Sequence, residues 1–144
     1  NGARGVPGMT SIEDIESHLI KLEVPYESIG EGAWVVHPDD ARRAHIGVQL
    51  QEPIVLFSMP LFELHDETPN RESLFRRLLE LNAELLHSSY SLDGDQVVLS
   101  GAHQLANLDS SEFQAMIDDM SMALDNHYDT LQPWATPADR EGNA

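Results

Sequence analysis

The fold is decided by residues 71–100, which read RESLFRRLLELNAELLHSSYSLDGDQVVLS. An amphipathic helix opens this segment, because the apolar residues from Leu74 to Leu86 fill one arc of about 160° on a helical wheel and charged residues fill the opposite side. A β-hairpin follows, since Asp93-Gly94 between two alternating runs is a typical two-residue turn. Asn82 is the exception in the helix, because it lies near the middle of the apolar arc.

The apolar arc of this helix is wider than contact with one sheet requires, which leaves surface for a second partner. It divides into two stripes, one with Leu74, Leu78, Leu81 and Leu85 and the other with Phe75, Leu79, Asn82 and Leu86. We expect the second stripe to meet its own copy across a two-fold axis. Asn82 would then fix the register of that interface at some cost in stability. The alternative is that Asn82 is buried within one chain and hydrogen-bonds nearby backbone.

The rest of the chain extends this segment into one α+β domain. Thr10 and Glu13 form a capping box ahead of a short first helix. Residues 26–59 hold three or four antiparallel strands, because the gaps between their β-branched runs are too short for the helical crossovers of parallel strands. Asp109 and Glu112 cap a closing helix. The predicted order is helix, strands, helix, hairpin, helix, with one mostly antiparallel sheet and the helices packed on one face.

A single domain accounts for the length, because a chain of 144 residues buries roughly two thirds of the surface that it exposes when unfolded. We expect residues 1–9 to be a disordered or vector-derived leader and residues 10–132 to be the domain. Residues 133–144 are expected to be a frayed tail, apart from Trp134, which we expect to fold back onto the domain. Residues 60–70 are expected to connect the strands to the helix.

The charge and the composition restrict the partners. The chain has 25 acidic and 8 basic side chains, a formal net charge of -17. This charge repels nucleic acids and anionic membrane surfaces, so we expect neither as a partner. No apolar run approaches the roughly 20 residues that span a bilayer, and without a signal peptide pattern we expect a cytoplasmic protein. The absence of cysteine excludes a disulfide framework, a thiolate nucleophile and a cysteine zinc site.

No residue pattern predicts a catalytic site, a metal site or a cofactor. Glu84 and His87 have the i, i+3 spacing of di-iron bundles, but they lie on the polar side of the wheel and no second Glu-x-x-His partner exists. The serines lack a nucleophile elbow and the glycines lack the lysine of a phosphate loop. His127 falls on the apolar stripe of the closing helix, where we expect a hydrogen-bonded histidine at the edge of the core.

A family resemblance runs over about residues 11–131. The run LFRRLLELNAELLHSSYSLDGDQVVLS, preceded by WVVHP and EPIVLFSMPLFEL and followed by NLDSSEFQAMIDDMSMALDNHYDTL, resembles YbjN-type proteins, a bacterial group described as sensory transduction regulators. Those proteins are similar in fold to type III secretion chaperones of the Tir-chaperone class. The resemblance implies a small, acidic, homodimeric, non-enzymatic module, and chaperones of that shape use paired apolar patches to hold an unfolded effector segment.

We therefore expect a homodimeric, chaperone-like protein-binding module that holds an extended segment of an effector or regulatory protein. The predicted dimer contacts are Phe75, Leu79, Asn82 and Leu86. The predicted partner contacts are large apolar groups near strand ends and in the connector, namely Trp34, Phe57, Leu61 and Phe62. These four residues alternatively belong to the core. Two other functions stay open: a regulatory or sensory domain that binds a signalling protein or a small ligand, and a hydrolase or metal enzyme.

Overall fold

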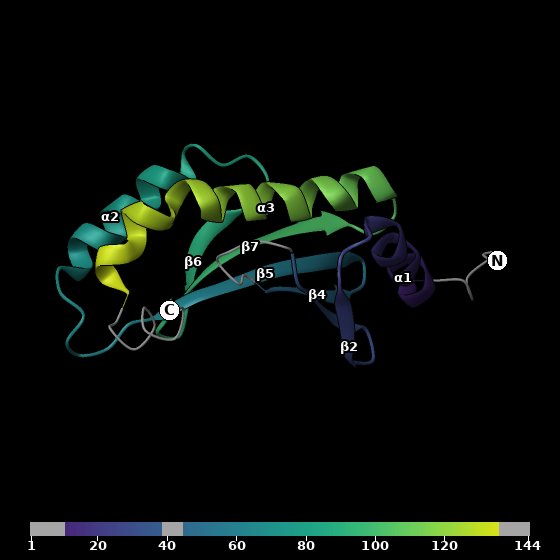
Figure 1. The fold of residues 1–144 in the computed structure, drawn as a ribbon, viewed down its shortest axis with the longest axis horizontal. Coiled ribbons are helices and arrows are strands. Elements are labelled where there is room, and N and C mark those ends of the chain that lie inside the picture. The colour runs from purple at the N-terminus through teal and green to yellow at the C-terminus, as the bar shows by residue number, and fades with distance from the viewer. Residues whose placement is uncertain (1–10, 39–44, 136–144) are drawn as a thin grey trace.

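In the part of the chain that the structure describes, the protein folds into three α-helices and one six-stranded sheet (Figure 1). The computed structural model describes residues 11–38 and 45–135. Along the chain, the elements are α1 (Ser11–Leu22), β2 (Tyr26–Gly30), β3 (Ala33–Val36), β4 (Ile46–Gln51), β5 (Ile54–Glu63), α2 (Arg71–Asn82), β6 (Ser89–Asp93), β7 (Gln96–Gln104), α3 (Ser110–Leu131) and the short 3-10 helix η2 (Gln132–Trp134). The α+β order predicted from the sequence is confirmed, with four strands before α2.

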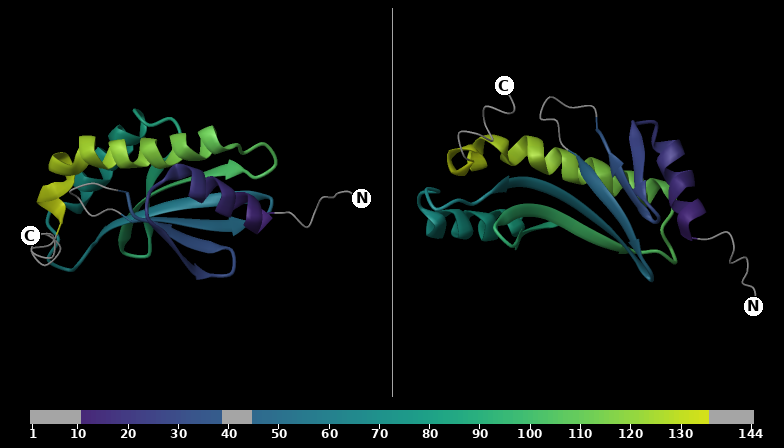
Figure 2. Two further views of the ribbon diagram at one scale, coloured as in Figure 1. Left: turned by 45° about the vertical axis from the view of Figure 1, so that its right-hand side comes forward. Right: turned by 90° about the horizontal axis from the view of Figure 1, so that it is seen from below.

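The sheet is antiparallel throughout, with the strand order β2-β3-β4-β5-β7-β6. β2 and β6 are therefore its two edges. Figure 2 shows that α3 runs along one face of the sheet and that α1 lies at the end where β2 and β3 are found. α2 lies beside β6. The edge strand β6 is thus the one that packs against α2.

The core lies between the sheet and the helices, and the alternation of strand side chains builds it. In β5, buried and less buried positions alternate from Ile54 to Met59, as expected of a strand with one covered face. Phe57 meets Phe113 of α3 edge to face, with ring centroids 5.4 Å apart. Trp34 is 1% exposed, and its indole N–H donates to Glu16 on α1 over 3.4 Å. These contacts join both helices to the central strands.

The hairpin is confirmed, but its turn lies one residue later than predicted. Asp93 pairs with Gln96, so the two loop residues are Gly94 and Asp95. Gly94 has a φ of 63°, and a glycine with positive φ at the first loop position is typical of a type II′ turn. The two-residue turn is therefore formed by Gly94-Asp95 and not by Asp93-Gly94.

Two element boundaries also differ from the prediction. β5 continues to Glu63, so much of the expected connector is strand, and a bulge between Pro60 and Phe62 accommodates the proline. α2 ends at Asn82, where the backbone N–H of Ala83 bonds to the carbonyl of Glu80 and tightens the last turn. The predicted helix therefore stops before Leu86, which lies in the loop that leads to β6.

The ends of the described chain follow the sequence signals. Asp109 and Glu112 form the predicted capping box, in which each side chain accepts from the other residue's backbone N–H. The hydrogen bond from the backbone N–H of Glu112 lowers the pKa of the Asp109 carboxyl, and the Ser111 hydroxyl adds to this effect. Trp134 folds back as predicted, since its indole N–H donates to the carbonyl of Asn70 over 3.2 Å. The predicted cap at Thr10 and the expected leader lie outside the described residues.

Candidate functional site

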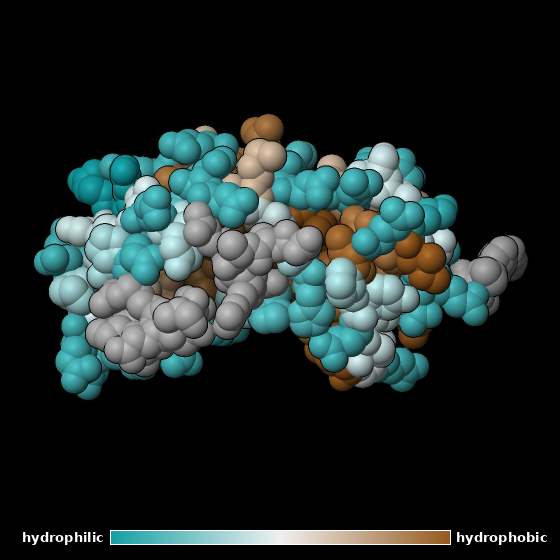
Figure 3. Space-filling model, viewed as in Figure 1, coloured by the Kyte–Doolittle hydropathy of each residue, from teal (hydrophilic) through white to brown (hydrophobic). Residues whose placement is uncertain are grey.

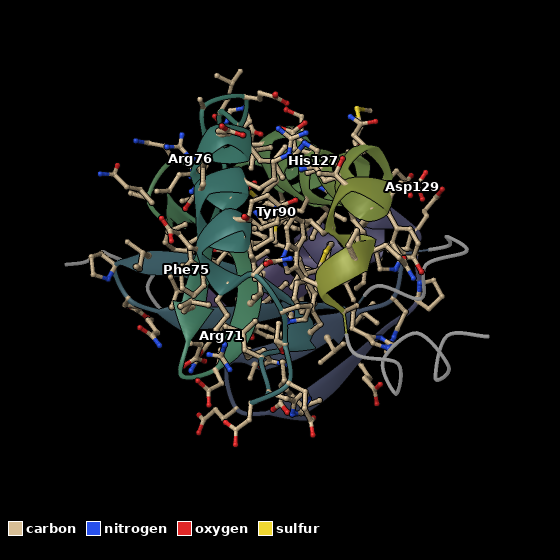
Figure 4. All side chains as sticks on the ribbon, turned by 90° about the vertical axis from the view of Figure 1, so that its left-hand side faces the viewer. Arg71, Phe75, Arg76, Tyr90, His127 and Asp129 are labelled. Atoms are coloured by element: carbon tan, nitrogen blue, oxygen red, sulfur yellow. The ribbon has the colours of Figure 1, made fainter. Side chains whose placement is uncertain are left out.

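The predicted dimer stripe on α2 is partly exposed. Leu79 is 70% exposed, and Leu86, in the loop after the helix, is 90% exposed. Phe75 is half-buried and packs against the core cluster; in Figure 4 it lies on the side of α2 away from His127. The structure thus leaves Leu79 and Leu86 as apolar surface beside a half-buried Phe75. Leu74, Leu78 and Leu81, from the other stripe, are buried as predicted.

Asn82 bonds within the chain, as the second of its two predicted roles requires. Its side-chain oxygen accepts from the backbone N–H of Tyr90 over 2.7 Å, and its side-chain nitrogen donates to the Tyr90 carbonyl over 3.2 Å. Tyr90 belongs to β6, so the amide of Asn82 takes the place of a neighbouring strand at this point of the edge. An unpaired strand edge invites pairing with other chains. Asn82 therefore covers part of the β6 edge with a side chain from α2.

Three polar side chains contact one another next to Asn82: Tyr90 of β6, His127 of α3 and Glu84 in the loop after α2. The hydroxyl of Tyr90 lies 2.7 Å from Nδ1 of His127, and Nε2 of His127 lies 3.7 Å from the carboxylate of Glu84. Figure 4 shows Tyr90 and His127 between the two helices. Burial raises the pKa of the Tyr90 hydroxyl, so the group stays protonated. The prediction of a hydrogen-bonded histidine at the core edge is confirmed, since His127 is buried.

A small open pocket adjoins His127 where the α2–β6 loop meets α3. Its volume is about 210 Å³. Leu86 and Met122 give it apolar walls, and both are strongly exposed. His87 and Asp119 also line it, with 3.3 Å between the imidazole and the carboxylate. The pocket therefore combines an apolar rim with two histidine–carboxylate pairs, one of them formed by His127.

The other edge of the sheet is open. All five residues of β2 are exposed, and among the described residues no strand pairs with its outer side. His37 donates its backbone N–H to the carbonyl of Pro25. Because alternate residues of an antiparallel strand point their backbone groups to the same side, Tyr26 and Ser28 direct theirs away from β3. These groups form the row that an incoming strand would pair with.

Exposed apolar side chains surround this open edge. Ile29 is 60% exposed on β2, and Ile20 is 65% exposed on α1. Tyr26 is also exposed, at 37%. In Figure 3, hydrophobic residues gather at the end of the molecule where α1 and β2 lie. We name Ile20, Tyr26, Ser28 and Ile29 the β2 edge surface. This surface was not predicted from the sequence, although Ile20 lies off the apolar stripe of the first helix, a position that indicates exposure.

The predicted partner contacts lie elsewhere. Trp34 and Phe57 are fully buried, and Phe62 is 6% exposed. Leu61 is half-buried at the bulge of β5. Large apolar residues on strands usually belong to the core. Here α1 contacts Trp34 and α3 contacts Phe57. The structure therefore favours the core alternative for Trp34, Phe57 and Phe62, and only Leu61 keeps accessible surface.

Within residues 11–38 and 45–135, no three histidine, aspartate or glutamate side chains converge in an arrangement that could hold a metal ion. Glu84 and His87, the spacing that resembled a di-iron ligand step, point to different partners, His127 and Asp119. None of the described helices combines the length and the apolar character that crossing a bilayer requires.

Over the described residues, a six-stranded antiparallel sheet with three helices places the chain in the α+β class of folds. The CesT_Tir_1 family model matches residues 9–136, and the chain belongs to this family. A sequence search of curated proteins gives no match. The family match confirms the predicted resemblance to chaperones of the Tir-chaperone class.

Solved structures are similar in fold. YbjN from E. coli matches with a TM-score of 0.65 and 15% identity over 85% of this chain and 94% of that one. A chain of the heterodimeric ExoU–SpcU complex from the type III secretion system of Pseudomonas aeruginosa matches with a TM-score of 0.60 and 16% identity, over 85% and 98% of the two chains. A chain of the HopA1–SchA chaperone–effector complex matches with a TM-score of 0.50 and 16% identity, over 85% and 89%.

Proposed function

We propose that this chain is a non-enzymatic, chaperone-like module that binds an extended segment of an effector-type partner protein. The observation that carries the proposal is the β2 edge surface, which combines free backbone groups with exposed apolar side chains. An extended segment that pairs with such an edge gains main-chain hydrogen bonds, and side-chain contacts give it specificity. Two of the solved structures similar to this chain are of complexes, one of them described as a chaperone with its effector.

The charge of the chain indicates the chemistry of the segment. A formal net charge of -17 attracts basic partners and repels acidic ones. The exposed groups of the β2 edge surface, Ile20 and Ile29 among them, favour apolar side chains at alternate positions of the incoming strand. We therefore expect an extended segment that is basic or neutral and carries alternating apolar residues.

The test is a capture from the native host with the tagged full chain and two variants of the β2 edge surface. Ser28→Pro removes an outward N–H without removing a bond to β3, and Ile29→Asp places a charge on the apolar surface. Leu92→Asp is the matched control, because Leu92 is 45% exposed on β6 at the opposite edge. We expect wild type and Leu92→Asp to retain the same protein and the two β2 variants to lose it. Retention by all four chains, with circular dichroism unchanged, would contradict the proposal.

We also propose that two copies pair through Phe75, Leu79 and Leu86, three of the four predicted contacts; the fourth, Asn82, is left out because its amide bonds to Tyr90 of the same chain. Leu79 and Leu86 support this, since both are exposed in one chain and their burial between two copies would stabilise the pair. Leu79→Asp should convert a dimer into a monomer, which halves the native mass to that of one chain, 16.0 kDa. Leu92→Asp should leave the mass unchanged. A wild-type chain that is already monomeric at micromolar concentration contradicts the pairing.

A second function is favoured by the pocket beside His127. An apolar rim with a few polar groups is typical of small-ligand sites, although about 210 Å³ admits only a small molecule. This would make the chain a regulatory domain that responds to a ligand. Screening small metabolites by thermal shift on wild type and on Met122→Asp tests it, because Met122 lines the pocket and lies away from the β2 edge surface. A ligand that stabilises wild type alone supports the regulatory function, whereas equal shifts in both chains argue against it.

A further inference from the structure

A cluster of two histidines and one glutamate lies apart from the binding surfaces described above, on the face of the sheet opposite the core. Val36 pairs with Ile46, so the next step of the same register brings His37 opposite His45. Trp34 and Val36 point into the core, and because side chains alternate along a strand, His37 points to the other face. Glu27 pairs with Val35 and so shares that face. The strand register itself therefore assembles Glu27, His37 and His45.

The side-chain geometry of this cluster is specific. Nδ1 of His37 lies 2.8 Å from Nδ1 of His45, and the rings meet edge to face at 87°. Nε2 of His37 lies 2.8 Å from a carboxylate oxygen of Glu27. A carboxylate oxygen accepts, so Nε2 of His37 carries the proton and Nδ1 of a neutral His37 presents a lone pair to His45. The two Nδ1 atoms thus face each other at hydrogen-bond distance, and a carboxylate fixes the tautomer of one ring.

We propose that His37 and His45 form a two-histidine site for a divalent transition-metal ion of the zinc class. Nδ1 of each ring is a ligand, Glu27 orients His37 from behind, and water fills the remaining positions. A ligating histidine whose second N–H donates to a carboxylate is the usual arrangement at protein metal sites, since the carboxylate fixes the ring and raises its basicity. The proposal is independent of the binding function proposed above.

The distances fit after a small movement. With metal–nitrogen bonds of about 2.0–2.1 Å, two ligands of a tetrahedral ion lie about 3.3 Å apart, so the two nitrogens need to separate by about half an ångström. Both histidine side chains are on the surface, so their rings can rotate enough to separate the two nitrogens by this distance. The net charge of -17 raises the local concentration of cations. Imidazole favours zinc, copper and nickel over magnesium, which prefers oxygen ligands.

The test is titration of the purified full chain with Zn²⁺ at neutral pH by calorimetry. We expect one Zn²⁺ per chain at this site, weakened at least about tenfold by His37→Ala and by His45→Ala, and about tenfold by Glu27→Gln. His103→Ala is the matched control, because His103 is also a surface histidine near a carboxylate, 3.8 Å from Glu112. This control should bind Zn²⁺ as wild type does. Circular dichroism checks that each variant keeps its fold.

Two further results distinguish the site from its alternatives. A nitrogen-15 spectrum should show Zn²⁺ shifting the Nδ1 signals of His37 and His45, whereas unchanged signals mean that the rings only share a proton, which overturns the proposal. Competition by millimolar Mg²⁺ should leave Zn²⁺ binding in place. If Mg²⁺ displaces Zn²⁺, or if His37→Ala and His45→Ala bind as wild type does, the ion is held by carboxylates and the assignment is wrong.

Discussion

Replacing Asn82 with alanine removes the two hydrogen bonds that join α2 to the β6 edge. Both partners are backbone groups of Tyr90, at 2.7 and 3.2 Å. Tyr90 is 5% exposed, so its N–H and carbonyl find little water when the amide of Asn82 is gone. The substitution therefore tests whether a single polar residue fixes this edge.

The expected cost follows from ordinary hydrogen-bond energies. Each bond contributes about 1 kcal/mol net, and a buried backbone group left without a partner costs about 1–3 kcal/mol. Asn82 itself is half-buried, so some water reaches the truncated site and the lower end of that range applies. Alanine regains roughly 0.5 kcal/mol of helix propensity at the end of α2. We expect Asn82→Ala to lower the free energy of unfolding by about 2 kcal/mol.

Urea unfolding followed by far-ultraviolet circular dichroism measures this difference. Arg76→Ala is the control, because the Arg76 side chain is 80% exposed on the same helix and its ion pair to Glu80 is long, at 4.0 Å. We expect this control to change stability by less than about 0.5 kcal/mol. In parallel, hydrogen exchange at the Tyr90 amide should accelerate in Asn82→Ala alone. Unchanged exchange at Tyr90, together with a stability within about 0.5 kcal/mol of wild type, would refute the reasoning.

Three further substitutions probe the fold. An added Cβ at Gly101 would lie 2.5 Å from the carbonyl oxygen of His87, so the backbone must shift; Gly101→Ala should cost about 1–3 kcal/mol in urea unfolding, and an unchanged midpoint would show that the approach is looser. Tyr90→Phe removes the bond to His127 and should cost about 1 kcal/mol in the same assay, whereas a stabilised variant would contradict this role of the hydroxyl. The pKa of Asp109 is lowered by the backbone N–H of Glu112, so its stabilisation is present above the pKa of the unfolded chain and disappears as the pH falls through the lower pKa of the folded state. The gap in melting temperature between wild type and Asp109→Ala should therefore shrink between about pH 7 and about pH 3, and a constant gap would contradict the capping interaction.

The sequence predicted the elements well where local signals were strong. The capping box of α3 and the hairpin both come from short-range chemistry, and both are confirmed. The predicted end of α2 was too late, because the apolar pattern on the helical wheel continues to Leu86. In the structure the helix ends at Asn82, whose side chain accepts a hydrogen bond from the backbone N–H of Tyr90. That contact joins residues in different elements, and periodicity within one element carries no sign of it.

The candidate surfaces were harder to predict for a related reason. A large apolar residue on a strand, such as Trp34 or Phe57, has the same local pattern whether a helix or a partner covers it. Only the strand order decides, because it places β2 at an open edge and β6 beside α2. For the same reason the meeting of His37 and His45 depends on a register that no spacing rule reveals.

The most direct test of the central claim is hydrogen exchange on the complex between the full chain and the protein that it retains. If the partner segment adds a strand to β2, the amides of Tyr26 and Ser28 acquire hydrogen-bond acceptors and their exchange slows. The amide of Leu92, at the opposite edge, should exchange as it does in the unbound chain. A bound partner that leaves Tyr26 and Ser28 exchanging as before would contradict strand addition at β2.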